Sequence, residues 1–147
     1  MCQHCDYKHL LGKAGLDATS NRLQVLEAVG ANTGPLTAGE IFDIVERNQS
    51  INRVTVYRIL DLLVENNLLE RLRGGGRVAY YGLAPNEHHA PHPHFYCRLC
   101  GQLDCLREGS VSIDTELLRR TFAGAIERVE IRVDGVCRNC LKQLKNQ

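Results

Sequence analysis

Hydrophobic residues in the first half of the chain recur with helical spacing. The third and longest of these segments places its apolar residues at positions i, i+3, i+4 and i+7, which predicts a helix with one buried stripe. The three segments contain Leu23, Leu26 and Val29; Ile41, Ile44 and Val45; and Val56, Ile59, Leu60 and Leu63. Thr19, Thr37 and either Ser50 or Asn52 stand where each helix would begin and can cap it.

Two short segments with strand character follow the helices. Residues 68–73 and 77–83 flank Gly74-Gly75-Gly76, and Val78 and Tyr80 stand at alternate positions of the second segment. Strand segments around a glycine-rich turn predict a β-hairpin. Three helices followed by a hairpin are the element order of a winged helix-turn-helix domain.

The composition changes at residues 84–94, which contain three of the four prolines and four of the six histidines. Because proline disfavours helix and extends the chain, we interpret this stretch as a linker between domains 1–83 and 95–147. Strands are expected at 95–97, 103–106 and 127–133, with a helix capped by Ser110 or Ser112 between the last two. The fold class is therefore α+β, a winged-helix domain followed by a small α/β domain.

Four cysteines of the second domain form two Cys-x-x-Cys pairs, Cys97/Cys100 and Cys137/Cys140, with 36 residues between the pairs. Each pair can form a tight knuckle that offers two thiolates, and two knuckles supply the four tetrahedral ligands of Zn²⁺. The alternative is two disulfides or four unrelated thiols, which a reducing compartment disfavours. The spacing predicts a closed structural zinc site.

Composition and charge narrow the function classes only slightly. The chain has 147 residues, is 44% hydrophobic and 24% charged, and carries a formal net charge of +1. We find no apolar run that could span a membrane and no signal region at the N-terminus, so we expect a cytoplasmic protein without a membrane partner. A net charge near zero neither supports nor excludes a nucleic-acid partner.

Local arginines could nevertheless form a DNA-binding surface. The exposed face of the third helix carries Tyr57 and Arg58, with Arg53 near its start. An arginine on a helix in the major groove can bridge guanine O6 and N7. The hairpin adds three arginines suited to phosphate contacts, namely Arg71, Arg73 and Arg77. The alternative interpretation is a solvated helix face beside a basic hairpin.

Four motifs stand out along the chain: Asn52-Arg-Val-Thr-Val-Tyr-Arg-Ile-Leu-Asp-Leu-Leu63, Thr19-Ser-Asn-Arg22, His92-Pro-His94-Phe-Tyr-Cys97-Arg-Leu-Cys100-Gly101 and Gly135-Val-Cys137-Arg-Asn-Cys140. Together they resemble the ferric uptake regulator superfamily, most closely its zinc uptake regulator branch. They occur in the family's order and cover nearly the whole chain. The resemblance implies a homodimer that binds palindromic operator DNA, a C-terminal dimerisation domain, and metal-dependent repression of metal-uptake genes. It implies neither enzymatic activity nor a small organic substrate.

The resemblance also implies roles for individual residues. Cys97, Cys100, Cys137 and Cys140 match structural zinc ligands, and Arg22, Tyr57 and Arg58 match DNA contacts. Our predicted DNA-binding set also includes Arg53, Thr55 and Arg77. His92 and His94 match ligands of a regulatory metal at the hinge. Cys105 falls where iron-sensing members carry a glutamate ligand. The fourth regulatory ligand is open between the hinge residues His88 and His89 and a residue of the first domain such as Glu70.

The chain departs from the family pattern at four places. Pro93 and Val129 replace two ligands of an accessory metal site, so we expect that site to be absent. Pro35 stands where some members carry a ligating histidine, and Tyr81 or Gly82 stands where the hairpin often ends in a glutamate or cysteine ligand.

The identity of the regulatory metal follows from the donor types. Two histidines and one cysteine are borderline-soft ligands and favour Zn²⁺, with Fe²⁺ and Mn²⁺ as alternatives. In an extended segment His92 and His94 fall on the same side, whereas Cys105 could instead be an ordinary buried strand residue. Cys2, His4 and Cys5 form a further candidate chelating cluster, with reactive terminal thiols as the alternative.

Three other functions remain open on the sequence alone. One is an iron-, manganese- or peroxide-responsive member of the same family. The second is a zinc hydrolase that would use His92, His94 and Cys105 around an activated water, with Glu87 as the nearest candidate base. The third is a zinc-stabilised protein-interaction module without a DNA role.

Overall fold

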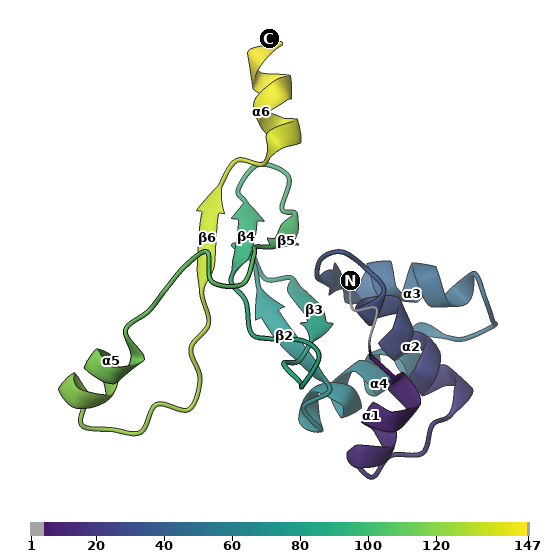
Figure 1. Ribbon diagram of the computed structural model, residues 1–147. Coiled ribbons are helices and arrows are strands. Elements are labelled where there is room, and N and C mark those ends of the chain that lie inside the picture. Colours follow the sequence, from purple (N-terminus) through teal and green to yellow (C-terminus); the bar gives the residue numbers. More distant parts are fainter. Residues whose placement is uncertain (1–4, 147) are drawn as a thin grey trace.

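A computed structural model describes residues 5–146, which form two separate three-stranded sheets with their own helices (Figure 1). The first sheet and its helices belong to the winged-helix domain, and the second sheet belongs to the C-terminal domain. The elements of the winged-helix domain are α1 (Tyr7–Lys13), α2 (Ser20–Gly30), β1 (Leu36–Thr37), α3 (Ala38–Glu46), α4 (Arg53–Glu65), β2 (Leu69–Arg73) and β3 (Ala79–Leu83).

Side-chain caps fix the starts of the three main helices. Thr19 accepts a hydrogen bond from the backbone N–H of Arg22 at the start of α2. Thr37 and Glu40 form a reciprocal capping box at the start of α3. Asn52 caps α4 by accepting from the N–H of Thr55 at 2.8 Å. Of the two candidates for the third cap, the structure therefore uses Asn52.

The apolar stripes predicted from the sequence form one core. Val25, Leu26, Ile41, Leu60 and Leu63 are among its fully buried members, and they come from α2, α3 and α4. The sheet has the order β1-β3-β2 and contributes Leu69, Tyr81 and Leu83 to the same core. The winged helix-turn-helix prediction is confirmed. Helix α1 and strand β1 were not predicted.

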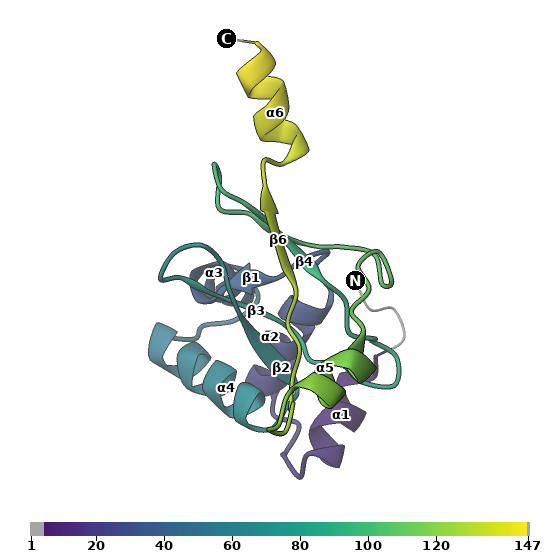
Figure 2. The same cartoon turned by 90° about the vertical axis from the view of Figure 1, so that its left-hand side faces the viewer.

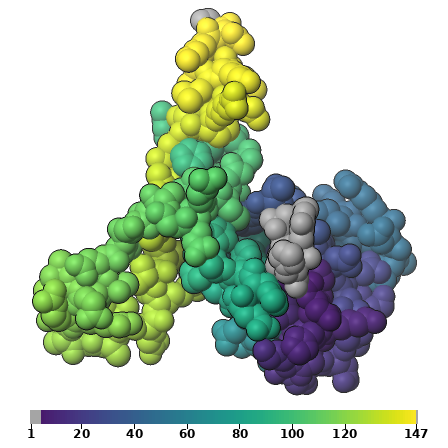
Figure 3. Space-filling view, viewed as in Figure 1, coloured from purple at the N-terminus to yellow at the C-terminus, as the bar shows by residue number. Residues whose placement is uncertain are grey.

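The C-terminal sheet comprises β4 (His94–Cys97), β5 (Leu103–Cys105) and β6 (Arg132–Gly135), in the order β5-β4-β6. Strand β4 pairs antiparallel with β5 and parallel with β6. Helix α6 (Arg138–Lys145), which was not predicted, extends from one end of this sheet (Figure 2). Helix α5 (Thr115–Thr121) stands clear of the sheet (Figure 1). The space-filling view shows both helices as projections from the molecule (Figure 3).

Two details of the predicted C-terminal domain are wrong. The strand expected at 127–133 starts only at Arg132, because the neighbouring chain before β4 contains Pro91 and Pro93, which have no N–H to pair. The helix expected after Ser110 or Ser112 is capped by Asp114 instead, which accepts from the N–H of Leu117 at 2.9 Å.

The segment between the two sheets contains little regular structure. Residues 84–93 carry one isolated bridge, between Asn86 and His89. His94, which we assigned to the linker, is the first residue of β4. The domain limits at residues 83 and 95 stay a prediction. No helix in residues 5–146 is long and apolar enough to cross a membrane.

Candidate metal centres and DNA-facing surface

Sheet pairing brings the two Cys-x-x-Cys pairs together. Strands β4 and β6 run parallel with Cys97 opposite Gly135, so both knuckles emerge from the same end of the sheet. The first knuckle closes when the N–H of Gly101 donates to Cys97 O at 2.9 Å, with Gly101 at a positive φ of 77° that favours glycine. In the second, Cys137 precedes α6 and Cys140 lies on its first turn.

The geometry of these four sulfurs fits a zinc ion. Zn–S bonds of about 2.3 Å in a tetrahedron require sulfur–sulfur separations of about 3.8 Å. Sγ of Cys100 lies 3.8 Å from Sγ of Cys137, and all four sulfurs lie within 4.8 Å of one another. The alternative of disulfides is contradicted, because Cys97, Cys100, Cys137 and Cys140 are free thiols.

Cys97 and Cys140 of this group have pKa values shifted in opposite directions. Backbone N–H groups, first that of Cys100 and then that of Cys137, lower the pKa of Cys97 to about 6. A hydrogen bond with the Cys137 thiol, together with burial, raises the pKa of Cys140 to about 12. Cys97 is therefore largely a thiolate at pH 7, whereas Cys140 keeps its proton until a bound cation displaces it.

A second cluster lies at the opposite end of β4. His94, the first residue of β4, is directly opposite Cys105, the last residue of β5, so their side chains share one face of the sheet. His92 precedes His94 by two residues and falls on the same side. The ligand atoms of His92, His94 and Cys105 all lie within 4.8 Å of one another.

The two histidines of this cluster are prepared for metal binding. His92 Nδ1 lies 3.1 Å from the carbonyl oxygen of Ala90, whereas its Nε2 is buried without a hydrogen-bond partner among the described residues. If Nδ1 donates to that carbonyl, Nε2 presents a lone pair to the cluster. Burial, with smaller contributions from His92 and His89, lowers the pKa of His94 to about 4. His94 is therefore neutral at pH 7, as a ligand must be.

Both domains line the small cavity of about 30 Å³ beside this cluster. Pro35, Glu70 and Gly82 come from the winged-helix domain, and His89 joins them from the hinge. Glu70 lies on β2 directly opposite Gly82 of β3. Gly82 stands where related hairpins often carry a ligand, so the Glu70 carboxylate on the neighbouring strand can take the place of that ligand. Of the first-domain candidates, the structure favours Glu70.

Glu70 is held between the cavity and the C-terminal domain. Its side chain is 17% exposed, and its Oε2 lies 3.5 Å from Nη2 of Arg128. Burial raises the pKa of Glu70, and this increase is opposed by the positive charges of Arg128 and His92. Arg128 could not be identified from the sequence, because it approaches Glu70 only through the fold.

His88 and His89, the two remaining hinge histidines, lie in different surroundings. The His89 ring is 5.1 Å from the His92 ring, and burial lowers the pKa of His89. His88 does not join the cluster: its half-exposed side chain lies 3.7 Å from Glu87, because its N–H donates to the side chain of Asn86 and fixes an outward turn.

The N-terminal cluster can be followed only in part. Cys2 and His4 lie outside the described residues. Sγ of Cys5 accepts a hydrogen bond from Nδ2 of Asn86 at 3.9 Å, which places Cys5 beside the hinge.

Four of the predicted DNA-binding residues, Arg53, Thr55, Tyr57 and Arg58, lie in the first half of α4, whereas Arg22 lies on α2. Tyr57 and Arg58 are exposed, and the guanidinium of Arg53 lies 4.5 Å from the centre of the Phe42 ring. Thr55 is partly buried, and Nη1 of Arg22 donates to the carbonyl oxygen of Asp17 at 3.1 Å.

The hairpin arginines differ in their freedom. Arg73 and Arg77 are exposed. Arg71 is engaged within the domain: its Nη2 lies 2.7 Å from Asp61 on α4, and its guanidinium lies over the Tyr81 ring. Arg71 therefore links α4 to the hairpin, and its role as a phosphate contact stays a prediction.

Comparison with known proteins places these observations in a family. The sequence profile described as "Ferric uptake regulator family" matches residues 13–131. The transcriptional regulator FurA of Mycobacterium tuberculosis strain H37Rv is 30% identical over 139 residues, which cover 92% of this chain and 90% of FurA.

Solved structures support the same fold. The ferric uptake regulator Fur of Helicobacter pylori superposes with a TM-score of 0.75 at 19% identity and covers 96% of this chain and 97% of its own. A zinc uptake regulator complexed with zinc and DNA has a TM-score of 0.66 at 22% identity, with coverages of 94% and 92%.

Proposed function

The chain belongs to the ferric uptake regulator family of metal-responsive, DNA-binding transcriptional regulators, and from this premise we propose that it is a zinc-responsive repressor of metal-uptake genes. In this proposal a homodimer binds a palindromic operator when the hinge site is loaded. Residues 1–83 bind DNA, 84–94 form the hinge and 95–147 form the dimerisation domain.

The observation that carries this proposal is the cluster at the domain junction. His92, His94 and Cys105 would hold the regulatory ion, and Glu70 is the donor best placed to complete the site from the winged-helix domain. Bound there, the ion would supply a positive charge shared by donors of both domains. His92 uses its free Nε2 for this purpose, and Glu70 exchanges its contact with Arg128 for the site.

The donor set is the reason for choosing zinc. One thiolate and two imidazoles are borderline-soft ligands and suit Zn²⁺ better than harder ions. The structural neighbour that was solved with zinc and DNA is consistent with this choice. Glu70 supports the second candidate, an iron- or manganese-responsive regulator, because a carboxylate beside two histidines also suits Fe²⁺ and Mn²⁺.

We assign a structural role to zinc at the four cysteines. Their sulfur spacing matches a tetrahedral Zn²⁺ site that leaves no position open for water. A closed site of this kind stabilises the fold and takes no part in sensing. In this proposal the four-cysteine site is structural and the hinge site is regulatory.

The homodimer is supported by unpartnered apolar surface. Helix α5 has seven residues and buries none of them, and such a short helix is not stable alone in water. Exposed apolar side chains gather on and beside it, including Ile113, Leu117, Phe122 and Val129. A second copy of the chain would cover this surface and bring two recognition helices to a two-fold symmetric operator.

Metal-buffered DNA binding tests the proposal. An operator would first be selected from a random duplex library with zinc-loaded protein, and its affinity would then be measured by fluorescence anisotropy in buffered Zn²⁺, Mn²⁺ and anaerobic Fe²⁺. We expect Zn²⁺ to restore binding at the lowest free concentration. Binding that responds only to Fe²⁺ or Mn²⁺ would favour the second candidate, and binding that no metal changes would contradict both.

A further inference from the structure

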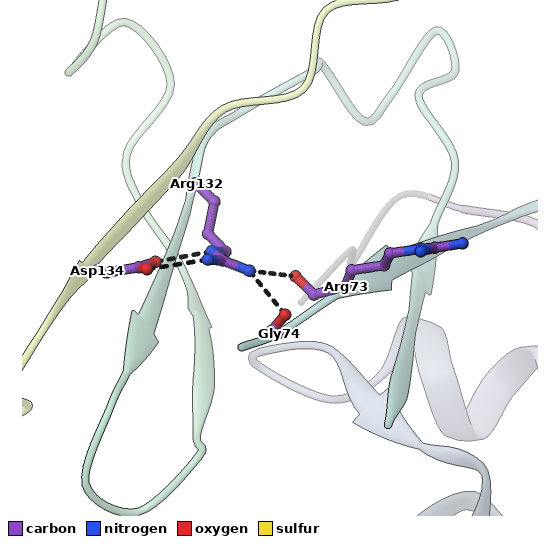
Figure 4. A network of polar contacts seen from close by, with 4 residues as sticks. All are labelled: Arg73, Gly74, Arg132 and Asp134. Carbon is purple, nitrogen blue, oxygen red and sulfur yellow. Dashed lines mark hydrogen bonds and ion pairs between the residues drawn. The ribbon is translucent and has the colours of Figure 1, made fainter. Parts of the chain in front are cut away.

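The tip of the hairpin, residues 73–76, is attached to the C-terminal sheet by Arg132 (Figure 4). Nη1 of Arg132 donates to the carbonyl oxygen of Gly74 at 2.7 Å and to that of Arg73 at 3.3 Å. The other side of the guanidinium makes a two-pronged contact with Asp134, at 2.7 Å and 2.9 Å. Because Asp134 fixes the guanidinium, the contact with the hairpin is pre-organised.

Tyr96 of β4 completes the surface that receives the hairpin tip. The Arg132 guanidinium lies 5.3 Å from the centre of the Tyr96 ring. A Cβ atom on Gly74 would lie 2.8 Å from this ring, and one on Gly75 would lie 2.6 Å from it. Only glycine allows the hairpin backbone to approach so closely, so this pair of glycines serves a packing role. Tyr80 adds a hydrogen bond from its hydroxyl to the carbonyl oxygen of Gly101.

Strand β2 connects this contact to the metal cavity. Glu70 and Arg73 lie on the same strand, about 10 Å apart at 3.3 Å per residue. Glu70 lines the cavity with His92, His94 and Cys105, and the carbonyl of Arg73 accepts from Arg132. Two attachment points on one strand fix the orientation of the winged-helix domain. In this orientation Glu70 lines the cavity beside the cluster, with its carboxylate against Arg128.

We propose that Arg132 and Tyr96 form a seat for the hairpin, and that this seat holds Glu70 on the wall of the cavity beside the regulatory cluster before metal binds, from where Glu70 leaves Arg128 to join the bound ion. The proposal rests on the regulatory site described under the proposed function. Arg132 is a positioning residue, because its contacts are with Asp134, the hairpin backbone and the Tyr96 ring and not with the candidate metal ligands. The effect of Arg132 on metal affinity follows from the population of the seated orientation. If losing Arg132 lowers that population by a given factor, the apparent dissociation constant of the metal rises by that factor.

The test measures metal affinity without DNA. Protein whose four-cysteine site is filled with zinc is titrated with buffered Co²⁺, whose absorption reports occupancy of the hinge site. Arg132→Ala removes the donor, and Gly75→Ala pushes the hairpin off the ring from the other side. We expect each variant to weaken Co²⁺ binding about tenfold, the loss typical of a hydrogen bond to a charged group.

The matched control is Gly76→Ala. A Cβ at Gly76 would have no heavy atom within 4 Å, and neither Gly75 nor Gly76 has a positive φ, so only the contact with Tyr96 distinguishes them. Gly76→Ala should retain wild-type Co²⁺ affinity. The double variant Arg132→Ala/Gly75→Ala should lose no more than either single variant, because both release the same seat.

The outcomes separate this inference from the proposed function. Unchanged Co²⁺ affinity in Arg132→Ala and Gly75→Ala, or additive losses in the double variant, would overturn the seat. His92→Ala is measured in parallel and should abolish Co²⁺ binding at the hinge. If His92→Ala bound Co²⁺ normally, the regulatory site itself would be misassigned.

Discussion

Replacing Cys97 by serine should unfold the C-terminal domain and leave the winged-helix domain folded. Cys97, Leu103 and Cys140 are the buried apolar side chains that the described structure contains after residue 94. Burial of a leucine contributes roughly 1.5–3 kcal/mol. Ordering even ten residues of backbone costs roughly 10–20 kcal/mol. Apolar burial within one chain therefore cannot hold this domain.

The zinc site supplies the missing free energy. Structural Zn²⁺ in small domains contributes roughly 10–16 kcal/mol at pH 7. Serine at position 97 removes the thiol whose pKa is about 6, the most acidic ligand of the set. We expect a loss of roughly 5 kcal/mol or more, which exceeds what such a domain can lose and stay folded.

Zinc analysis, circular dichroism and sedimentation would follow the change. Cys97→Ser should lose its tightly held zinc and its self-association, while much of the helical signal persists because the first core lies within residues 11–83. Cys105→Ser is the matched control, since it removes a thiol outside the four-sulfur group. A Cys97→Ser protein with full zinc content and native association would refute the reasoning.

Further predictions concern DNA contacts and pH. Arg58→Ala should weaken operator binding by roughly 1–3 kcal/mol if Arg58 reads a base edge, measured as the difference between operator and random DNA. Arg77→Ala should instead weaken binding to all sequences alike and reduce the salt slope by about one phosphate, as a titration with KCl would record. The His94 pKa of about 4 means that the unfolded chain binds a proton that the folded chain does not. The hinge-metal-free protein should therefore lose stability as pH falls from about 6.5 to 4, by about 2 kcal/mol between pH 7 and 5. Urea unfolding would check this, and His94→Asn should remove most of the dependence.

The winged-helix domain could be predicted from the sequence because its signals are local. A stripe such as Val56, Ile59, Leu60 and Leu63 and a cap such as Asn52 act within one or two helical turns. Fold class, helix order and the hairpin follow from such patterns. Strand β1 has two residues and is defined only by its pairing with β3, so it is too short for a periodic sequence pattern to predict it.

The C-terminal domain and the site depended on long-range contacts. The alternating residues 127–133 predict a strand, but the partner segment contains Pro91 and Pro93 and cannot pair with their first part. The grouping of Cys105 with His94 was predicted only through the family resemblance, and their cross-strand pairing is seen in the structure. The approach of Glu70 from the other domain was left open by the sequence. Arg132 and Tyr96 carried no signal, because their contacts with Gly74 and Gly75 join residues far apart in the chain.

The most direct test of the regulatory site is the zinc dependence of operator binding in hinge variants. His92→Ala and His94→Ala are compared with wild type and with His88→Ala, whose side chain faces Glu87 at the surface. After mild chelation all four proteins should retain about one zinc per chain, because the four-cysteine site is closed. Wild type and His88→Ala should regain operator affinity when Zn²⁺ is added, and His92→Ala and His94→Ala should not, since a ligand shifts a conformation only through differential binding. If the His92 and His94 variants still respond to zinc, the sensing site lies elsewhere and the central claim is wrong.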